Sequence, residues 1–422
     1  MTITKNTVSW IDVAANSDFP LQNLPFGIAR LSPDKSVTVS RIGDVVINLE
    51  MLQKLHVFDN LGFDFGSVFS QHVLNDFIDL GQAAHKAVRA KLMEVFDASF
   101  ADAELITKIK ATALFAISDA NMQMPVKVTD YTDFYSSIEH ATNVGMMFRD
   151  PANALLPNWR HLPVGYHGRA SSIVVSGTTI HRPKGQTMPQ GADKPVFGPS
   201  KMFDFELEMA FVVGRSTNLG DSVKVSEAED YIFGFLLFND LSARDIQAWE
   251  YVPLGPFLSK NFGSVVSPWI VTLDALEPFR VKGPNQEPEV LPYLKTEGER
   301  NFDINLEVLI KPESGAENLV CRSNFKYMYW NINQQLAHHT VNGCNINVGD
   351  LYASGTISGP DQGSYGSMLE LTWRGTRPIK LSDQTERKFI NDHDSLIIRG
   401  YSEKNGLRIG FGECITTILP AT

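Results

Sequence analysis

The chain is poor in the features that mark several large classes of protein. It has only 3 cysteines among 422 residues, and their wide spacing leaves no C-x-x-C pair. This scarcity argues against a disulfide scaffold or a thiolate zinc site, and it is typical of a reducing compartment. Residues 1–20 carry no basic leader and no long apolar run, and no apolar stretch approaches the length of a membrane span. We therefore expect a cytoplasmic protein.

An excess of positive charge is also missing. The chain has 37 Lys and Arg against 48 Asp and Glu, which gives a formal net charge of −11. A partner rich in phosphate needs a basic face, so nucleic acid and anionic membranes are not expected partners. The sequence contains no H-E-x-x-H, no G-x-S-x-G, no Walker loop and no G-x-G-x-x-G after a strand. A serine nucleophile or a nucleotide-dependent mechanism therefore has no support.

What the chain does contain is the composition of a folded protein with two parts. Its hydrophobic share of 43% predicts a sizeable core, and its length favours two domains. In the first part, segment 41–49 predicts a strand, and the spacing of apolar residues predicts helices over 84–95 and 106–113. Segment 119–128 resembles a passage between domains, so we expect an N-terminal domain over 1–120 and a C-terminal domain over 121–422.

The second part is rich in predicted strands. Alternating or short apolar runs bounded by Gly, Pro, Asn or Asp occur at 172–180, 203–213, 232–238, 302–310, 368–373, 395–399 and 415–419. No regular alternation of strands and helices is present. The pattern therefore indicates a mainly β protein of the α+β class.

Four carboxylates are candidates for a metal site. Glu206 and Glu208 lie on one face of the predicted strand FDFELEMAFVVG, about 7 Å apart. That spacing alone favours a solvated outer face. Asp240, however, ends the apolar run YIFGFLLFND, and Asp133 lies in the aromatic segment DYTDFYSSIEH, where an unpaired charge is poorly solvated. If the four acids converge, their oxygen ligands suit Ca²⁺ or Mg²⁺ better than zinc.

One histidine follows a helix-start signal. Ser136 and Glu139 fit the S-x-x-E capping box, which places His140 in or just after the first turn of a helix. A histidine there can act as a general base because its ordinary pKa lies near neutrality. A purely structural, hydrogen-bonded histidine is the ordinary alternative.

Five long segments closely resemble the fumarylacetoacetases of tyrosine and phenylalanine breakdown. They are DYTDFYSSIEHATNVGMMFR (130–149), LPVGYHGRASS (162–172), FELEMAFVVG (205–214), FNDLSARDIQAWEYVPLGPFLSKNFG (238–263) and ASGTISGP…GSMLELTWRG (353–375). The resemblance implies a small N-terminal β-barrel domain, a C-terminal mixed β-sandwich or β-roll domain, and a homodimer formed largely through the latter. It also implies a hydrolase that splits the carbon–carbon bond of a β-diketo dicarboxylate.

The resemblance also assigns roles to individual residues. It implies calcium ligands at Asp133, Glu206, Glu208 and Asp240, and a second, magnesium-type position at Asp240, Lys260 and Ser264. The lysine is expected to contribute there through its backbone, and the family commonly has Thr in place of Ser264. His140 matches the catalytic base and Glu370 the carboxylate that orients it; the segment SMLELTW predicts that Glu370 lies on a strand. Substrate contacts are implied for Tyr135, Arg149, Tyr166, Gln247, Tyr251 and Thr356.

The implied reaction begins when His140 takes a proton from water and the hydroxide attacks a carbonyl. Arg244, Gln247 and Lys260 are candidate donors to the oxygen on which negative charge builds. A carbon leaving group needs further stabilisation of charge, which a divalent Lewis acid provides. The alternatives are a hydrolase of acylpyruvate or fumarylpyruvate from the same superfamily, a divalent-metal hydrolase of another ester or amide, and a metal-stabilised protein without catalysis.

Overall fold

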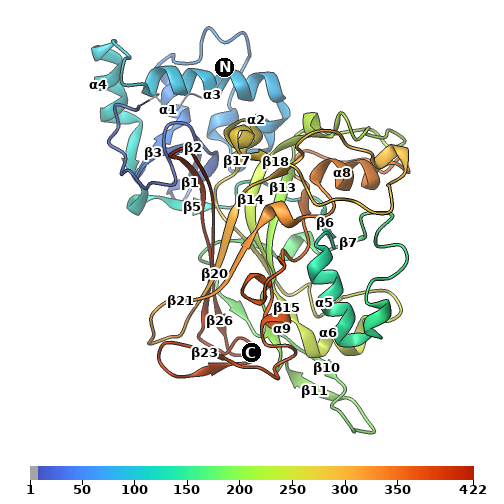
Figure 1. Ribbon diagram of the computed structural model, residues 1–422. Helices are drawn as coiled ribbons and strands as arrows, with labels where there is room; N and C mark the ends of the chain where they lie inside the picture. Colours follow the sequence, from blue (N-terminus) through green and yellow to red (C-terminus); the bar gives the residue numbers. More distant parts are fainter. Residues whose placement is uncertain (1–7) are drawn as a thin grey trace.

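The computed structural model describes residues 8–422. Residues 1–7, which belong to the segment 1–20 in which no leader is expected, lie outside the described residues. The N-terminal part, blue to cyan at the top left of Figure 1, contains a five-stranded antiparallel sheet. Its strand order is β4-β3-β2-β1-β5. Its strands are β1 (Gly27–Ser32), β2 (Lys35–Ile42), β3 (Val45–Asn48), β4 (Leu114–Ala116) and β5 (Asn121–Gln123). Its helices are α1 (Leu49–Lys54), α2 (Asn75–Asp79), α3 (Gln82–Phe96) and α4 (Ala103–Thr112).

Two predictions for this part were correct and one was wrong in detail. Helices α3 and α4 cover the two helical segments, and the apolar positions of α3 are buried. Segment 41–49 is not one strand, because β2 ends at Ile42 and β3 begins at Val45. Gly43 has a φ of 56°, which glycine adopts readily, and it turns the chain between the two strands.

The larger part contains a sheet of eight strands. Its order is β7-β6-β22-β13-β14-β16-β8, with β17 also paired to β14. The strands are β6 (Tyr131–Phe134), β7 (Gly165–His167), β8 (Ile173–Val175), β13 (Leu207–Val213), β14 (Ile232–Asp240), β16 (Ser264–Val266), β17 (Val271–Thr272) and β22 (Leu351–Ala353).

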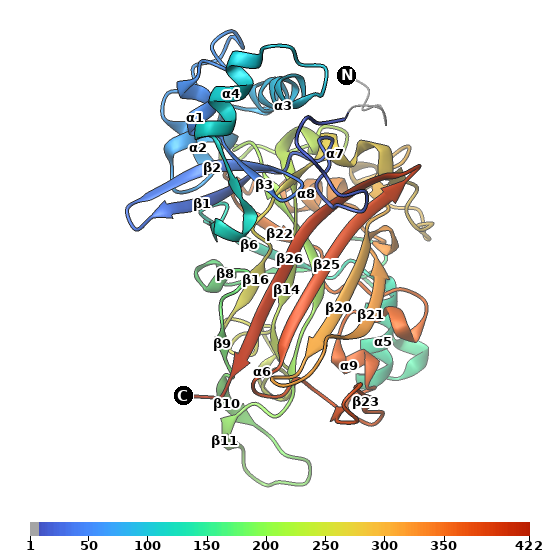
Figure 2. The same cartoon turned by 90° about the vertical axis from the view of Figure 1, so that its left-hand side faces the viewer.

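A second sheet, in the order β21-β20-β25-β26-β9, lies in front of β14 in the view of Figure 2. Its strands are β9 (Ile180–His181), β20 (Asn305–Lys311), β21 (Asn318–Asn324), β25 (Ser395–Lys404) and β26 (Leu407–Leu419). Four short pairs complete the β structure: β10 (Lys184–Thr187) with β11 (Val196–Pro199), β12 (Phe203–Asp204) with β15 (Ser242–Ala243), β18 (Arg280–Val281) with β19 (Asn301–Phe302), and β23 (Ile379–Lys380) with β24 (Glu386–Arg387). The helices are α5 (Ile138–Phe148), α6 (Arg244–Glu250), α7 (Leu273–Leu276), α8 (Ile332–Thr340) and α9 (Met368–Leu371).

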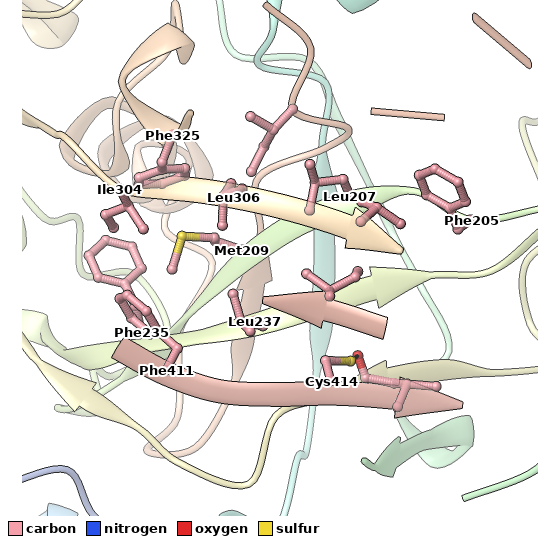
Figure 3. Packing of buried hydrophobic residues seen from close by; sticks show 14 of the residues in the cluster. Phe205, Leu207, Met209, Phe235, Leu237, Ile304, Leu306, Phe325, Phe411 and Cys414 are labelled. Atoms are coloured by element: carbon pink, nitrogen blue, oxygen red, sulfur yellow. Dashed lines mark hydrogen bonds between the residues drawn. The ribbon is translucent and has the colours of Figure 1, made fainter. Parts of the chain in front are cut away.

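The main hydrophobic core lies between these two sheets. Met209 of β13 and Leu237 of β14 meet Leu306 of β20 and Phe411 of β26, and all four side chains are buried (Figure 3). The alternation that places Phe205, Leu207, Met209 and Phe211 in this core directs the residues between them to the opposite face of the sheet. The expected mainly β, α+β class is confirmed. No helix within residues 8–422 combines the length and the hydropathy needed to cross a bilayer.

His85 of α3 packs where the N-terminal helices meet the larger sheet. Its ring lies 4.8 Å from that of Phe233 on β14, and one ring nitrogen contacts the carbonyl of Phe77. Burial lowers the pKa of His85 to about 4, despite the opposing hydrogen bonds from backbone. The histidine is therefore neutral when folded but takes a proton near pH 6.5 when unfolded.

We expect this histidine to make the fold sensitive to acid. Because the pKa of His85 is lower in the folded than in the unfolded state, its contribution to the free energy of unfolding is complete above about pH 6.5. That contribution, up to about 3 kcal/mol, is lost as the pH falls towards 4. Between pH 6.5 and 4, the melting temperature of His85→Gln should decrease less than that of the wild type. The exposed His72 offers the control, because His72→Gln should leave the wild-type slope unchanged.

Candidate active site

Four carboxylates on or next to strands of the larger sheet meet at one end of it. Asp133 is on β6, Glu208 on β13, and Asp240 is the last residue of β14, while Glu206 lies between β12 and β13. One oxygen from each lies within 4.8 Å of the others, and all four residues are buried. The solvated-face interpretation of Glu206 and Glu208 is therefore wrong. Antiparallel pairing of β13 with β14 brings Leu207 opposite Asn239, which sets these acids side by side.

Two basic side chains enter the cluster but do not neutralise it. Lys260 pairs with Glu206 and Asp240, and Arg244 pairs with Glu206 at 2.8 Å. With all four acids ionised, two formal negative charges stay uncompensated. Burial, and then the charges of its acidic neighbours, raise the pKa of Glu208 well above its usual range, and the same causes act on Asp133.

Unused acceptors in the cluster fit a divalent cation. Asp133 Oδ1 and Glu208 Oε1 are buried, and neither has a hydrogen-bond partner within residues 8–422. An unpaired buried acceptor costs free energy that a bound cation recovers. Carboxylate oxygens are ligands that Ca²⁺ and Mg²⁺ prefer, so the donor set suits a hard cation.

The residues expected at a second metal position also lie here. Ser264, the first residue of β16, donates a hydrogen bond of 2.8 Å to Asp240 Oδ1, so the hydroxyl is in place although the family commonly has threonine. The ammonium group of Lys260 lies inside the cluster. The pairing of β14 with β16 sets Ser264 directly opposite Asp240.

His140 and Glu370 form a buried pair beside the cluster. His140 Nδ1 lies 2.7 Å from Glu370 Oε2, and Glu370 has no solvent exposure. Burial opposes ionisation of Glu370, but the charge and hydrogen bond of His140 outweigh it, with help from Asn143 and Ser367, and lower its pKa. Glu370 is therefore an ionised carboxylate that can fix the tautomer of the imidazole and stabilise the imidazolium.

Two local predictions around this pair need correction. The helix cap is Ser137 and not Ser136, because the Ser137 hydroxyl accepts the backbone N–H of His140 and helix α5 begins at Ile138. Glu370 lies not on a strand but in the short helix α9. The alternation in SMLELTW misled because α9 is buried on all sides, so its apolar residues reveal no face.

Asp204, which the sequence reasoning missed, joins the two halves of the site. It accepts hydrogen bonds from the backbone N–H groups of Met368 and Leu369 at the start of α9, and from Arg244 Nε at 2.8 Å. Arg244 in turn pairs with Glu206 of the acidic cluster. Asp204 precedes Glu206 and Glu208 with the same spacing of two residues. This spacing is the feature of the sequence that could have identified Asp204 as a candidate site residue.

Three of the six residues expected to contact substrate lie at the pair or the cluster. The Tyr135 ring packs edge-on against His140, with 5.2 Å between centroids, and the buried Tyr166 hydroxyl faces Asp133. Gln247 accepts a hydrogen bond from Arg244. Of the other three, Thr356 is buried, Tyr251 is half exposed at 49%, and the exposed Arg149 donates to the carbonyl of Ala154.

Two family profiles match most of the chain. The family profile described as "Fumarylacetoacetase N-terminal" matches residues 22–125, and that described as "Fumarylacetoacetate (FAA) hydrolase C-terminal" matches residues 130–419. The chain belongs to the fumarylacetoacetate hydrolase family. The resemblance inferred from the five segments is therefore confirmed, and the chain is a hydrolase of this family.

Curated relatives share about half of the sequence. Fumarylacetoacetase of Homo sapiens is 52% identical over 417 residues, which cover 98% of this chain and 99% of the relative. The fumarylacetoacetase of Dictyostelium discoideum is 51% identical over 419 residues (98% of each chain), and that of Arabidopsis thaliana 48% over 417 residues (98% of each).

Solved structures of distant relatives share the fold. The fumarylacetoacetate hydrolase of Exiguobacterium antarcticum has a TM-score of 0.52 at 15% identity, covering 94% of this chain and 99% of its own. A maleylpyruvate hydrolase from Sphingobium has a TM-score of 0.50 at 13% identity, covering 94% and 100%. At such identities the likeness concerns the fold alone.

Proposed function

We propose that this protein hydrolyses the carbon–carbon bond of 4-fumarylacetoacetate to fumarate and acetoacetate, the last step of tyrosine and phenylalanine breakdown. The observation that carries the proposal is the site itself, where a buried acidic cluster lies beside a histidine held by a carboxylate. The near-complete alignment with curated fumarylacetoacetases supports the same substrate.

In the proposed mechanism, His140 acts as the base. Its Nδ1 donates to Glu370 Oε2, which leaves Nε2 as the unprotonated nitrogen. Nε2 removes a proton from water, and the hydroxide attacks the carbonyl carbon next to the bond that breaks. Glu370 stabilises the imidazolium that forms. When the tetrahedral intermediate collapses, the imidazolium returns the proton to the departing carbon.

The charge that builds on the attacked carbonyl oxygen needs donors, and we assign this role to Arg244, Gln247 and Lys260. Arg244 and Lys260 are buried, so their charges act with little screening. Their ion pairs with Glu206 hold both in place before the reaction. Preorganised donors of this kind need no rearrangement at the moment of attack.

For the metal, we propose Ca²⁺ held by the four carboxylates Asp133, Glu206, Glu208 and Asp240, and Mg²⁺ at the position of Asp240, Lys260 and Ser264. The unpaired acceptors of Asp133 and Glu208 support the first assignment. A divalent cation supplies Lewis-acid stabilisation of the negative charge that develops on substrate oxygens.

We further propose that Tyr135, Arg149, Tyr166, Gln247, Tyr251 and Thr356 contact a dicarboxylate substrate. The packing of Tyr135 against His140 supports a substrate bound beside the base.

We also propose a cytoplasmic homodimer with two domains and with no nucleic-acid or membrane partner. The expected domains were 1–120 and 121–422, but β5 (Asn121–Gln123) pairs with β1 of the N-terminal sheet, so we place the boundary after β5. The exposed apolar side chains Val252, Leu254 and Phe257, in the C-terminal part, support a dimer contact there. The negative net charge supports the absence of a phosphate-rich partner.

The test is a comparison of substrates with and without metal. The purified protein should release fumarate and acetoacetate from fumarylacetoacetate, lose this activity in a chelator, and regain it when Ca²⁺ or Mg²⁺ is added. Acylpyruvate and fumarylpyruvate serve as competing substrates, and esters and amides as unrelated ones. Faster cleavage of any of these would refute the proposed substrate.

A further inference from the structure

Asn143 contacts the same carboxylate as the proposed base, from the same helix. It lies three residues after His140 on α5, and its Nδ2 donates to Glu370 Oε1 at 2.9 Å. His140 Nδ1 holds the other oxygen, Oε2, at 2.7 Å. Two side chains of one helix therefore hydrogen-bond both oxygens of a single buried carboxylate.

The remaining partners of Glu370 come from outside α5. Ser358 contacts both oxygens at 3.0 Å, and Ser367, the N-cap of α9, contacts Oε2 at 2.8 Å. These hydroxyls satisfy the carboxylate but do not tie it to the helix that carries the imidazole. The Asn143 amide does, because residues three apart lie on one face of a helix.

We propose that Asn143 is a positioning residue for the base. Its bond to Oε1 fixes the plane of the Glu370 carboxylate so that Oε2 meets His140 Nδ1, which keeps Nε2 unprotonated and directed at water. Without this bond the carboxylate can turn about its remaining partners, and the imidazole loses its fixed orientation. Displacements of this kind cost roughly 10–100-fold in rate.

The inference rests on the proposed role of His140 and is tested by Asn143→Asp. The introduced carboxyl has the shape of the amide and donates to Glu370 Oε1 while it is protonated, but it cannot donate once it ionises. Burial beside a like charge raises its pKa. Asn143 contacts Glu370 of α9 directly, and the other titratable groups that interact with Glu370 are His140 and Glu139 of α5, Tyr135 and Cys321.

The measured quantity is kcat of the variant divided by kcat of the wild type at each pH. This ratio should be near one at acidic pH and fall roughly 10–100-fold as the pH rises through the pKa of the introduced acid. Asn143→Ala should lower kcat similarly at every pH, with little change in KM. Asn333→Asp is the matched control: Asn333 is buried on another helix, α8, and its amide donates to the carbonyl of Val225.

A merely structural role predicts a different result. Loss of folded protein would lower the apparent activity of Asn143→Ala and Asn143→Asp together, and activity per folded molecule would stay at the wild-type value. That outcome, or a pH-independent ratio for Asn143→Asp, would overturn the proposal. Two other outcomes would contradict the proposed function itself and not the role of Asn143. They are full activity in His140→Asn, and a wild-type protein that does not cleave the substrate.

Discussion

Replacing His140 with alanine is expected to abolish turnover of fumarylacetoacetate. The substitution removes the imidazole that is paired with Glu370 and therefore the group that deprotonates water. Loss of a general base lowers the rate by at least about 10²–10⁴-fold. The measurement is kcat with saturating metal, and the decrease should appear in kcat more than in KM because the base acts in the transition state.

The alanine variant also leaves the buried Glu370 without its strongest partner, so a second substitution separates catalysis from folding. The side-chain amide of His140→Asn still donates to Glu370 but offers no basic nitrogen. It should be as inactive as the alanine variant while its melting temperature stays closer to that of the wild type. The exposed His72 provides the control, since His72→Ala should retain full activity. Near-normal turnover in a folded His140→Asn protein would contradict the assignment.

Much of the fold could be predicted because the pattern of each element is local. The two-residue alternation of β13 and the unbroken apolar run of β14 predict strands, and the spacing in α3 predicts a helix. Helix α9 could not be predicted, because it has one turn and is buried throughout. Its position is set by tertiary contacts, namely the bonds from its first N–H groups to Asp204.

The candidate site shows the same division between local and distant information. Each acid of the cluster has a local signal, such as the end of an apolar strand for Asp240. Their convergence depends on the strand order β6-β22-β13-β14, and β22 is more than 200 residues from β6 in the sequence. No local pattern encodes that pairing, so the resemblance to a family had to supply it. Asn143 was missed because its partner, Glu370, is equally distant.

Glu208→Gln is expected to separate metal binding from the stability of the metal-free fold. Burial, and then the charges of Asp133 and Asp240, raise the pKa of Glu208 well above its usual range, so in the metal-free fold the balance shifts towards the protonated carboxyl. Glutamine resembles that protonated form. The metal-free melting temperatures of variant and wild type should therefore agree closely. With metal, the variant lacks one charged ligand, and affinity should fall by roughly 100-fold, the order of the ~3 kcal/mol lost with one partner of a buried charge pair.

Thermal unfolding in a Ca²⁺ titration tests both halves of this expectation. A ligand at 100 times its Kd stabilises the native state by about 2.7 kcal/mol, so wild-type melting should rise with Ca²⁺ while that of Glu208→Gln stays nearly flat over the same range. Glu307→Gln is the control, because Glu307 lies on β20 and pairs with Arg322 instead of the cluster. If Ca²⁺ raised the melting temperature of Glu208→Gln as much as that of the wild type, the cation would bind elsewhere. A large drop in its metal-free melting temperature would mean that Glu208 is needed as a charge in the empty cluster, contrary to the raised pKa.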